Sequence, residues 1–296
     1  MRNIIFKYWI ITILAISGCT DPINFETEPN AGYLVVEGLV TDAPGTNRVK
    51  LSRTGEFTNI FEGGLERPVT SAVVTIIDDQ NNTTDLVELS GGIYLTDSLV
   101  FRGELGRTYT LRIETSNGQV YESTPELLEK KVSFDELKSE FKEFEIVNDN
   151  NILVTREGTE LLVDMTFLEG RNVFVRHSWR YAIDKRVFFD IDYINVINSN
   201  NFSQNKVNDL SILLLEKNFG SLPQEFRMEV SQFTLSRTAF DFWDALAKQR
   251  ENGGSIFDAP PTRITGNIVN TGDPDEVVIG IFSAAGVTKR EIRFIQ

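Results

Sequence analysis

Beyond residue 32, most of the chain consists of short runs in which apolar and polar residues alternate. In the run 108–115, Tyr109, Leu111 and Ile113 occupy alternate positions. Because successive side chains of a β-strand point to opposite faces of the sheet, this pattern predicts a strand with one buried face. Similar runs occupy residues 33–41, 48–53, 72–77, 92–96 and 119–123. Turn-forming residues separate the runs, which predicts an antiparallel sandwich that ends near Pro125.

The second half of the chain contains further strand-like runs, at residues 160–167, 173–183, 210–215, 226–235, 263–270, 277–283 and 289–295. Between residues 126 and 145 the chain is rich in Glu and Lys, and its apolar spacing fits either a helix or a strand. The segment 188–206 contains many asparagines and predicts a long irregular excursion, a kind of loop that often carries function. We therefore expect a second, larger β-rich unit.

One helix is predicted near residues 237–252. Ser236 can cap its amino end, Phe240, Trp243 and Leu246 recur along one face together with Ala247, and two glycines at 253–254 end it. An apolar stripe of this width predicts a helix that docks on a sheet.

These patterns define the expected fold class and domains. The chain is expected to be mainly β, with an immunoglobulin-like or carboxypeptidase-regulatory-like antiparallel sandwich at residues 32–125. A second β-rich domain with one amphipathic helix follows at residues 126–296. Residues 1–18 and 19–31 do not fit either domain and have patterns of their own.

The amino-terminal segment has the pattern of a secretory signal peptide. Arg2 and Lys7 precede an apolar run of about nine residues at 8–16. A helix that crosses the membrane core needs about 20 apolar residues, so this run is too short for a span. The residues Ile-Ser-Gly-Cys at 16–19 resemble the bacterial lipobox. The pattern predicts a signal peptide at 1–18 that is removed, and lipidation of Cys19; the alternative is a stray cysteine in an uncleaved helix.

Cys19 is the only cysteine in the chain, so an intramolecular disulfide is excluded. A diacylated and N-acylated cysteine exceeds the two lipid signals that stable anchoring requires. Residues 20–30 are polar and interrupted by two prolines, as expected of a tether, and 11 such residues reach about 35 Å when extended. The predicted lipidated tether at 19–31 resembles surface-export segments in its acidic residues. We expect an outer-membrane anchor and a cell-surface position, with the periplasmic face as the alternative.

Composition narrows the classes of function. The net charge of −14 and the lack of a basic patch argue against nucleic-acid binding. A single histidine, His177, excludes zinc sites that draw on several His and Cys ligands, and any serine triad would depend on it. Neither a nucleophile-elbow spacing nor a Walker loop is present. We therefore assign no catalytic residue, no cofactor and no metal site, and do not expect an enzyme.

Two features could still carry chemistry, and both have a simpler structural interpretation. His177 alternates with Val175, Trp179 and Tyr181, which predicts an imidazole packed in an aromatic strand face. The acidic clusters at 78–79 and 273–276 fit turns whose side chains cap their own backbone. A calcium ion could use either cluster, but neither has EF-hand spacing. A pair of glycosidase carboxylates depends on a separation that the sequence does not give.

Several segments together resemble a known family. They are residues 34–38 with 41–42, 49–53, 108–113, 257–261, 266–270 and 278–284. In this order they are similar to the family known as domain of unknown function 4249, a group of Bacteroidota outer-membrane lipoproteins. The likeness runs through most of the chain. The resemblance implies a lipoprotein that is often encoded beside a TonB-dependent outer-membrane transporter, and it supplies no catalytic residues. Members often have cysteines in the middle region, which this sequence lacks.

The resemblance and the absence of a catalytic pattern favour an accessory or ligand-presenting subunit of a TonB-dependent transporter. The segments 188–206 and 257–261 are the expected contact sites. An adhesive or structural surface module is the first alternative, and an unrecognised hydrolase is the second. A transporter partner would co-purify after mild detergent extraction, whereas an adhesin would purify alone and bind cells or matrix. A hydrolase would lose turnover when an acid pair is removed.

Overall fold

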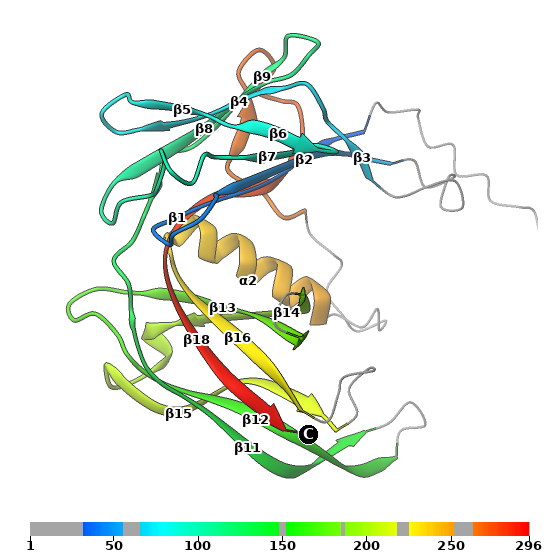
Figure 1. Cartoon of the computed structure of the whole chain (residues 1–296), viewed down its shortest axis with the longest axis vertical. Helices are drawn as coiled ribbons and strands as arrows, with labels where there is room; N and C mark the ends of the chain where they lie inside the picture. Colours follow the sequence, from blue (N-terminus) through cyan, green and yellow to red (C-terminus); the bar gives the residue numbers. More distant parts are fainter. Residues whose placement is uncertain are drawn as a thin grey trace, which may run out of the picture. The chain divides into compact units, whose positions relative to one another are not determined.

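The computed structural model describes residues 32–55, 66–147, 152–184, 187–217, 225–251 and 263–295 (Figure 1). These residues form strands in three sheets and one α-helix, α2 (Arg237–Glu251). The predicted mainly β fold with an amphipathic helix is therefore confirmed. The predicted signal peptide, Cys19 and the tether lie outside the described residues, as does the segment 257–261.

Two sheets face each other across the first hydrophobic core. The first sheet contains β1 (Leu34–Thr41), β2 (Arg48–Thr54), β3 (Glu66–Pro68), β6 (Val87–Ser90) and β7 (Ile93–Leu95). The second contains β4 (Val73–Asp78), β5 (Thr83–Asp85), β8 (Thr108–Glu114), β9 (Val120–Ser123), β10 (Glu126–Leu127) and β17 (Ile268–Asn270). Tyr109, Leu111 and Ile113 are buried against Leu34 and Val36, as the alternation predicted. Of the strand predicted at 263–270, only the last three residues are in a strand.

A second core lies between the other strands. A three-stranded sheet contains β11 (Ser133–Val147), β12 (Leu153–Thr166) and β15 (Lys206–Glu216). The strands β13 (Phe174–Asp184), β14 (Val187–Asn198) and β16 (Glu225–Leu235) continue the sheet that contains β1. Leu161 and Val163 from β12 share this core with Val175 and Trp179 from β13 and with Met228 from β16.

The prediction of an irregular excursion at 188–206 is wrong over most of its length. β14 pairs antiparallel with β13 as far as Asn198, and the 3-10 helix Ser199–Asn201 follows it. Two of the asparagines that suggested a loop have side-chain partners in this arrangement. The side chain of Asn195 lies 3.0 Å from His177 Nδ1, and that of Asn198 caps the 3-10 helix. The undecided segment 126–145 is mostly strand, because β12 pairs along the full length of β11.

One strand belongs to both halves of the molecule. β18 (Val278–Ile295) pairs in parallel with β1 as far as Ala285, and antiparallel with β16 from Gly286 onward. A single sheet therefore runs in the order β14-β13-β16-β18-β1-β2-β7-β6, with β3 paired to β2. The prediction of two strands at 277–283 and 289–295 is wrong, because the small residues between them stay in the ladder; Ala284 and Ala285 are fully buried. The predicted domain boundary at 125/126 remains a prediction.

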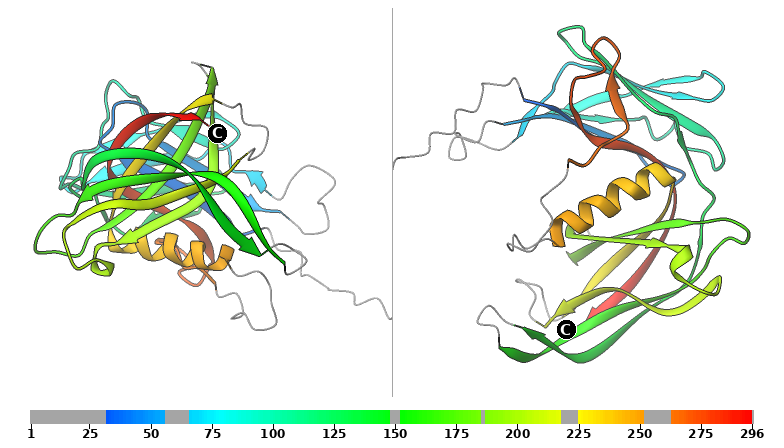
Figure 2. Two further views of the ribbon diagram at one scale, coloured as in Figure 1. Left: turned by 90° about the horizontal axis from the view of Figure 1, so that it is seen from below. Right: turned by 180° about the vertical axis from the view of Figure 1, so that it is seen from behind.

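The helix α2 packs on this sheet through the first half of its length (Figure 2). Ser236 Oγ accepts a hydrogen bond of 3.1 Å from the Ala239 N–H, which is the predicted cap. Ala239 and Phe240 are buried, and the Phe240 ring stacks on that of Phe174 with centroids 4.5 Å apart. These contacts fix the start of the helix, and Phe242, Trp243 and Leu246 beyond them form part of a pocket.

Candidate ligand-binding site

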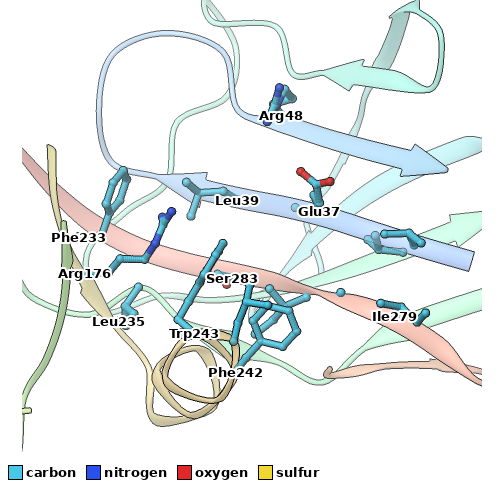
Figure 3. Close-up of a pocket in the computed structure, with 16 residues that line it drawn as sticks. Glu37, Leu39, Arg48, Arg176, Phe233, Leu235, Phe242, Trp243, Ile279 and Ser283 are labelled. Carbon is cyan, nitrogen blue, oxygen red and sulfur yellow. The ribbon is translucent and has the colours of Figure 1, made fainter. Parts of the chain in front are cut away.

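A pocket of about 440 Å³ lies between α2 and the continuous sheet (Figure 3). Its floor comes from β1 and β18, which supply Val35, Glu37, Leu39, Ile279, Ile281 and Ser283. Its wall comes from α2, through Phe242, Trp243 and Leu246. Arg176, Phe233 and Leu235 of β13 and β16 contribute the remaining side, and Arg48 of β2 also lines it. Most of these side chains are apolar, so the pocket suits a largely apolar ligand.

The alternation of the strands fixes the floor of the pocket. In β1, Val36 and Val40 point into the first core, so Val35 and Leu39 must point to the opposite face. In β18, Phe282 is in the same core, and its neighbour Ile281 faces the pocket. The sandwich and the pocket are therefore the two sides of one sheet.

The same rule places Arg176 in the pocket. Val175 and His177 are buried on the side of the second core, so Arg176, which lies between them, projects from the other face of β13. It stands directly opposite Phe233 in the antiparallel pairing of β13 with β16. This position brings its guanidinium group to the side chains of α2 (Figure 3).

The guanidinium of Arg176 contacts aromatic rings. Its central carbon lies 3.8 Å from the centroid of the Trp243 ring and 5.8 Å from that of Phe233, both within cation–π range. Its Nε is fully buried without a hydrogen-bond partner, and no described residue forms an ion pair with the guanidinium. Burial lowers the pKa of Arg176 to about 10, so the group stays charged at neutral pH.

The acidic residue of the pocket already has a partner. Glu37 forms an ion pair of 3.4 Å with Lys50, whose amine also binds Glu66 at 2.6 Å. Arg48 is exposed and lines the same pocket. The pocket thus contains a cation without a described counter-ion, in a chain whose net charge is −14. Such a balance favours an anionic ligand group.

A buried polar cluster anchors the amino end of α2 beside the pocket. Ser236 donates a hydrogen bond to Glu126, and Asn267 Nδ2 donates another of 3.0 Å. Asn267 also accepts from the Phe282 N–H at 3.0 Å and donates to the Phe282 carbonyl at 2.8 Å. Burial raises the pKa of Glu126, although both hydrogen bonds act in the opposite direction. The cluster therefore connects the helix, β10 and β18.

His177 does not reach the pocket. It is fully buried in the second core, with Nε2 3.2 Å from Gln232 Oε1 and Nδ1 3.0 Å from Asn195 Oδ1. Burial lowers its pKa to about 4, and the neighbouring charge of Arg176 acts in the same direction. The prediction that His177 is packed in the strand face with Val175 and Trp179 is confirmed.

The acidic clusters also lie away from the pocket. Asp78 accepts hydrogen bonds of 2.9 Å from the N–H groups of Gln80 and Asn82, which is the predicted capped turn. Its carboxylate lies 2.8 Å from Arg107. Within the described ranges there is no group of three His, Cys, Asp or Glu residues that could hold a metal ion. No helix in the same ranges is long and apolar enough to cross a membrane.

Sequence analysis did not single out Arg176 as a site residue. The available signal was an arginine on the strand face opposite His177, together with an apolar helix expected to dock on a sheet. Phe240 does dock. Trp243 packs against the same cluster and also lines the pocket, and Leu246 lines the pocket. Arg176 could not be identified from the sequence because the sequence does not show which strands lie beside the helix.

The geometry defines a class of β-rich protein in which one sheet joins two hydrophobic cores and forms, with a helix, an apolar pocket that contains an arginine. The family model described as domain of unknown function (DUF4249) matches residues 20–291. The chain belongs to this family, as the resemblance indicated. No curated protein matches the chain.

Proposed function

We propose that this protein is an accessory subunit at the outer membrane, anchored through a lipid on Cys19, that binds a small molecule and presents it to a TonB-dependent transporter. The observation that carries the proposal is the pocket beside α2, whose volume of about 440 Å³ lies within the usual range of small-molecule sites. Apolar walls around a cation without a counter-ion are typical of a binding site.

The anchor supports a partner in the same membrane. The lipobox-like residues 16–19 and the short polar segment 20–30 keep the folded part within about 35 Å of the lipid. A transporter in that membrane is then within reach, and the resemblance to lipoproteins encoded beside such transporters supports the same partner.

The edge strand β14 is the contact surface that we favour. It lies at one end of the nine-stranded sheet, and its side chains Phe189 and Tyr193 are 44% and 50% exposed. Aromatic residues are enriched among the energetically important contacts of protein interfaces. The contact expected within 188–206 is thereby reassigned from a loop to a strand.

Site-specific crosslinking in intact cells tests the proposal. A photoreactive residue at position 189 or 193 should crosslink to the neighbouring transporter, and the crosslink should disappear in Cys19→Ser. Leu99 is the control position, because it is 94% exposed and lies outside β14. Recovery of only monomer or self-crosslinks, with the transporter expressed, would contradict the proposal. Purification of the chain alone, with binding to cells or matrix, would favour an adhesive module instead.

A further inference from the structure

We infer that the pocket beside α2 takes a small molecule with one carboxylate group and an apolar body, with the carboxylate bound by Arg176. This inference rests on the proposed function and specifies the chemical class of its ligand. The charge of the pocket, the geometry of its cation and the nature of its walls each support this ligand class.

The charge of Arg176 needs a counter-ion. A buried charge is costly unless it is paired, and a cation–π contact compensates for only part of the lost hydration. Arg176 has aromatic contacts with Trp243 and Phe233, but no described residue gives it a hydrogen bond or an ion pair. Its pKa of about 10 keeps it protonated at neutral pH. An anionic group of a ligand would supply the missing partner.

The geometry of this cation favours a carboxylate. A guanidinium presents parallel N–H donors that match the two oxygens of a planar carboxylate. The other basic residue of the pocket, Arg48, is exposed. Glu37, which also lines the pocket, is an acid, and its partner Lys50 is shared with Glu66. A doubly charged phosphate would therefore meet a single half-buried cation for its two charges, whereas a carboxylate carries one charge and needs only that cation.

The walls select an apolar body. Val35 and Leu39 on the floor, Ile279 and Ile281 beside them, and Leu246 on the helix are hydrocarbon surfaces that face one another. Burial of apolar ligand surface against these walls removes it from water and favours binding. The combination of one cationic position and hydrocarbon walls fits an aliphatic or aromatic monocarboxylic acid.

Three matched probes test the inference: phenylbutanoate, phenylbutanol and phenylbutylamine, which share one apolar body and differ in charge. The full lipidated chain in lipid nanodiscs is titrated with each probe, with empty discs as the reference for partitioning. Trp243 lies against the guanidinium of Arg176, so tryptophan fluorescence reports on the pocket. Trp243→Phe identifies that signal, because Trp179 lies in the second core. We expect phenylbutanoate to bind about tenfold more tightly than phenylbutanol, with phenylbutylamine weakest.

Variants assign the preference to one residue. Arg176→Gln should remove the preference for the acid over the alcohol and leave alcohol affinity within about twofold. Arg112→Gln is the matched control and should keep the preference, because this arginine is on β8, outside the pocket, and pairs with Glu122. If Arg176→Gln does not fold, as judged by its melting curve, Leu246→Trp serves instead: it fills the pocket and should abolish acid binding.

Several outcomes would overturn the inference: equal affinity of the wild-type chain for acid and alcohol, preference for the amine, or no saturable response to any probe. Acid preference that survives in Arg176→Gln, or acid binding that survives in Leu246→Trp, would do the same. The crosslinking test at Tyr193 is independent of these titrations. If the chain crosslinks to the transporter but does not prefer the acid, the proposed partner stands and this ligand class is refuted. If it prefers the acid but does not crosslink, the ligand class stands and the proposed partner is refuted.

Discussion

The carboxylate of Asp42 accepts a hydrogen bond of 2.9 Å from the N–H of Val287, 245 positions later in the sequence. Its second oxygen lies 2.6 Å from Lys131 Nζ, and Arg102 donates to its backbone carbonyl. Asp42 follows β1 directly, and Val287 is in the part of β18 that pairs with β16. One buried side chain therefore ties the part of this sheet that covers the first core to the part that covers the second.

Asp42→Ala should destabilise the fold by about 3 kcal/mol, because it leaves a buried N–H and a lysine without their partner. Asp42→Asn keeps an acceptor for Val287 and should cost only about 1 kcal/mol. Urea unfolding of the two variants measures the difference. Equal stability of Asp42→Ala and the wild type would show that this connection is dispensable.

Gly280→Ala should be at least as damaging. Gly280 has a φ of +96°, and a Cβ at this position would lie 2.1 Å from the backbone oxygen of Val36 on the paired strand. We expect a loss of about 3 kcal/mol or failure to fold. Gly272→Ala is the matched control, since its Cβ would meet nothing closer than 3.5 Å. Similar melting temperatures for the two variants would contradict this account.

His177 should make stability depend on pH. Its folded pKa of about 4 lies below the ordinary value of 6.5, so the unfolded chain binds the proton more readily. The stability that neutral His177 contributes is complete above pH 6.5 and is lost as the pH falls towards 4. At about 1.4 kcal/mol per pKa unit, the loss is roughly 3 kcal/mol. Comparison with His177→Gln, which does not titrate, isolates this contribution; parallel stability curves would exclude it.

Substitution of His177 should leave ligand binding intact. The imidazole lies on the face of β13 opposite Arg176 and is enclosed by the second core. We expect His177→Ala to lower stability by about 2–4 kcal/mol and to keep its phenylbutanoate affinity at a temperature where it is folded. A folded variant with an unchanged melting temperature and no ligand binding would reverse the structural assignment of this residue.

Glu126→Gln should be tolerated at neutral pH. Because burial raises the folded pKa of Glu126 above its ordinary value, stability from this group is complete at low pH and is lost as the pH rises through that folded pKa. A neutral amide avoids the loss and can still contact Ser236 and Asn267. We expect Glu126→Gln to match or exceed the wild-type melting temperature at neutral pH, whereas Glu126→Ala lowers it. A deficit of Glu126→Gln relative to the wild type that grows as the pH rises towards neutral would contradict this sign.

Cys19→Ser tests the predicted anchor. Without the thiol no diacylglycerol can be attached, so the chain should accumulate as the uncleaved precursor or as a soluble form. Mass spectrometry of the amino-terminal peptide and salt extraction of membranes measure both results. A Cys19→Ser chain that is still cleaved after Gly18 and resists extraction would refute the lipid anchor.

Local pattern predicted those strands whose alternation is complete, such as β8, where Tyr109, Leu111 and Ile113 all enter the first core. It failed at β14, because asparagine favours loops locally and the contact of Asn195 with His177 forms only in the folded sheet. It also failed at the centre of β18, where two separate strands were expected at 277–283 and 289–295. Ala284 and Ala285 are small because the sheet is crowded there from both sides.

The pocket could not be predicted from the local sequence pattern either, because it depends on pairings between distant strands. Its floor depends on the parallel pairing of β1 with β18, which brings Val36 opposite Gly280. Its cation depends on the pairing of β13 with β16, which sets Arg176 opposite Phe233. The alternation of residues along β13 predicted that the side chains of His177 and Arg176 lie on opposite faces of the strand. It did not predict which elements pack against the face that carries Arg176.

The double pairing of β18 also has a consequence for the order of events during folding. A chain that emerges amino end first completes β1 and β16 well before the strand that must lie between them. Until β18 arrives, each of these strands has an unpaired edge of the kind that promotes association with other chains. Contacts so distant in sequence also slow folding. We therefore expect both halves of the molecule to complete folding together, when β18 pairs with β1 and β16.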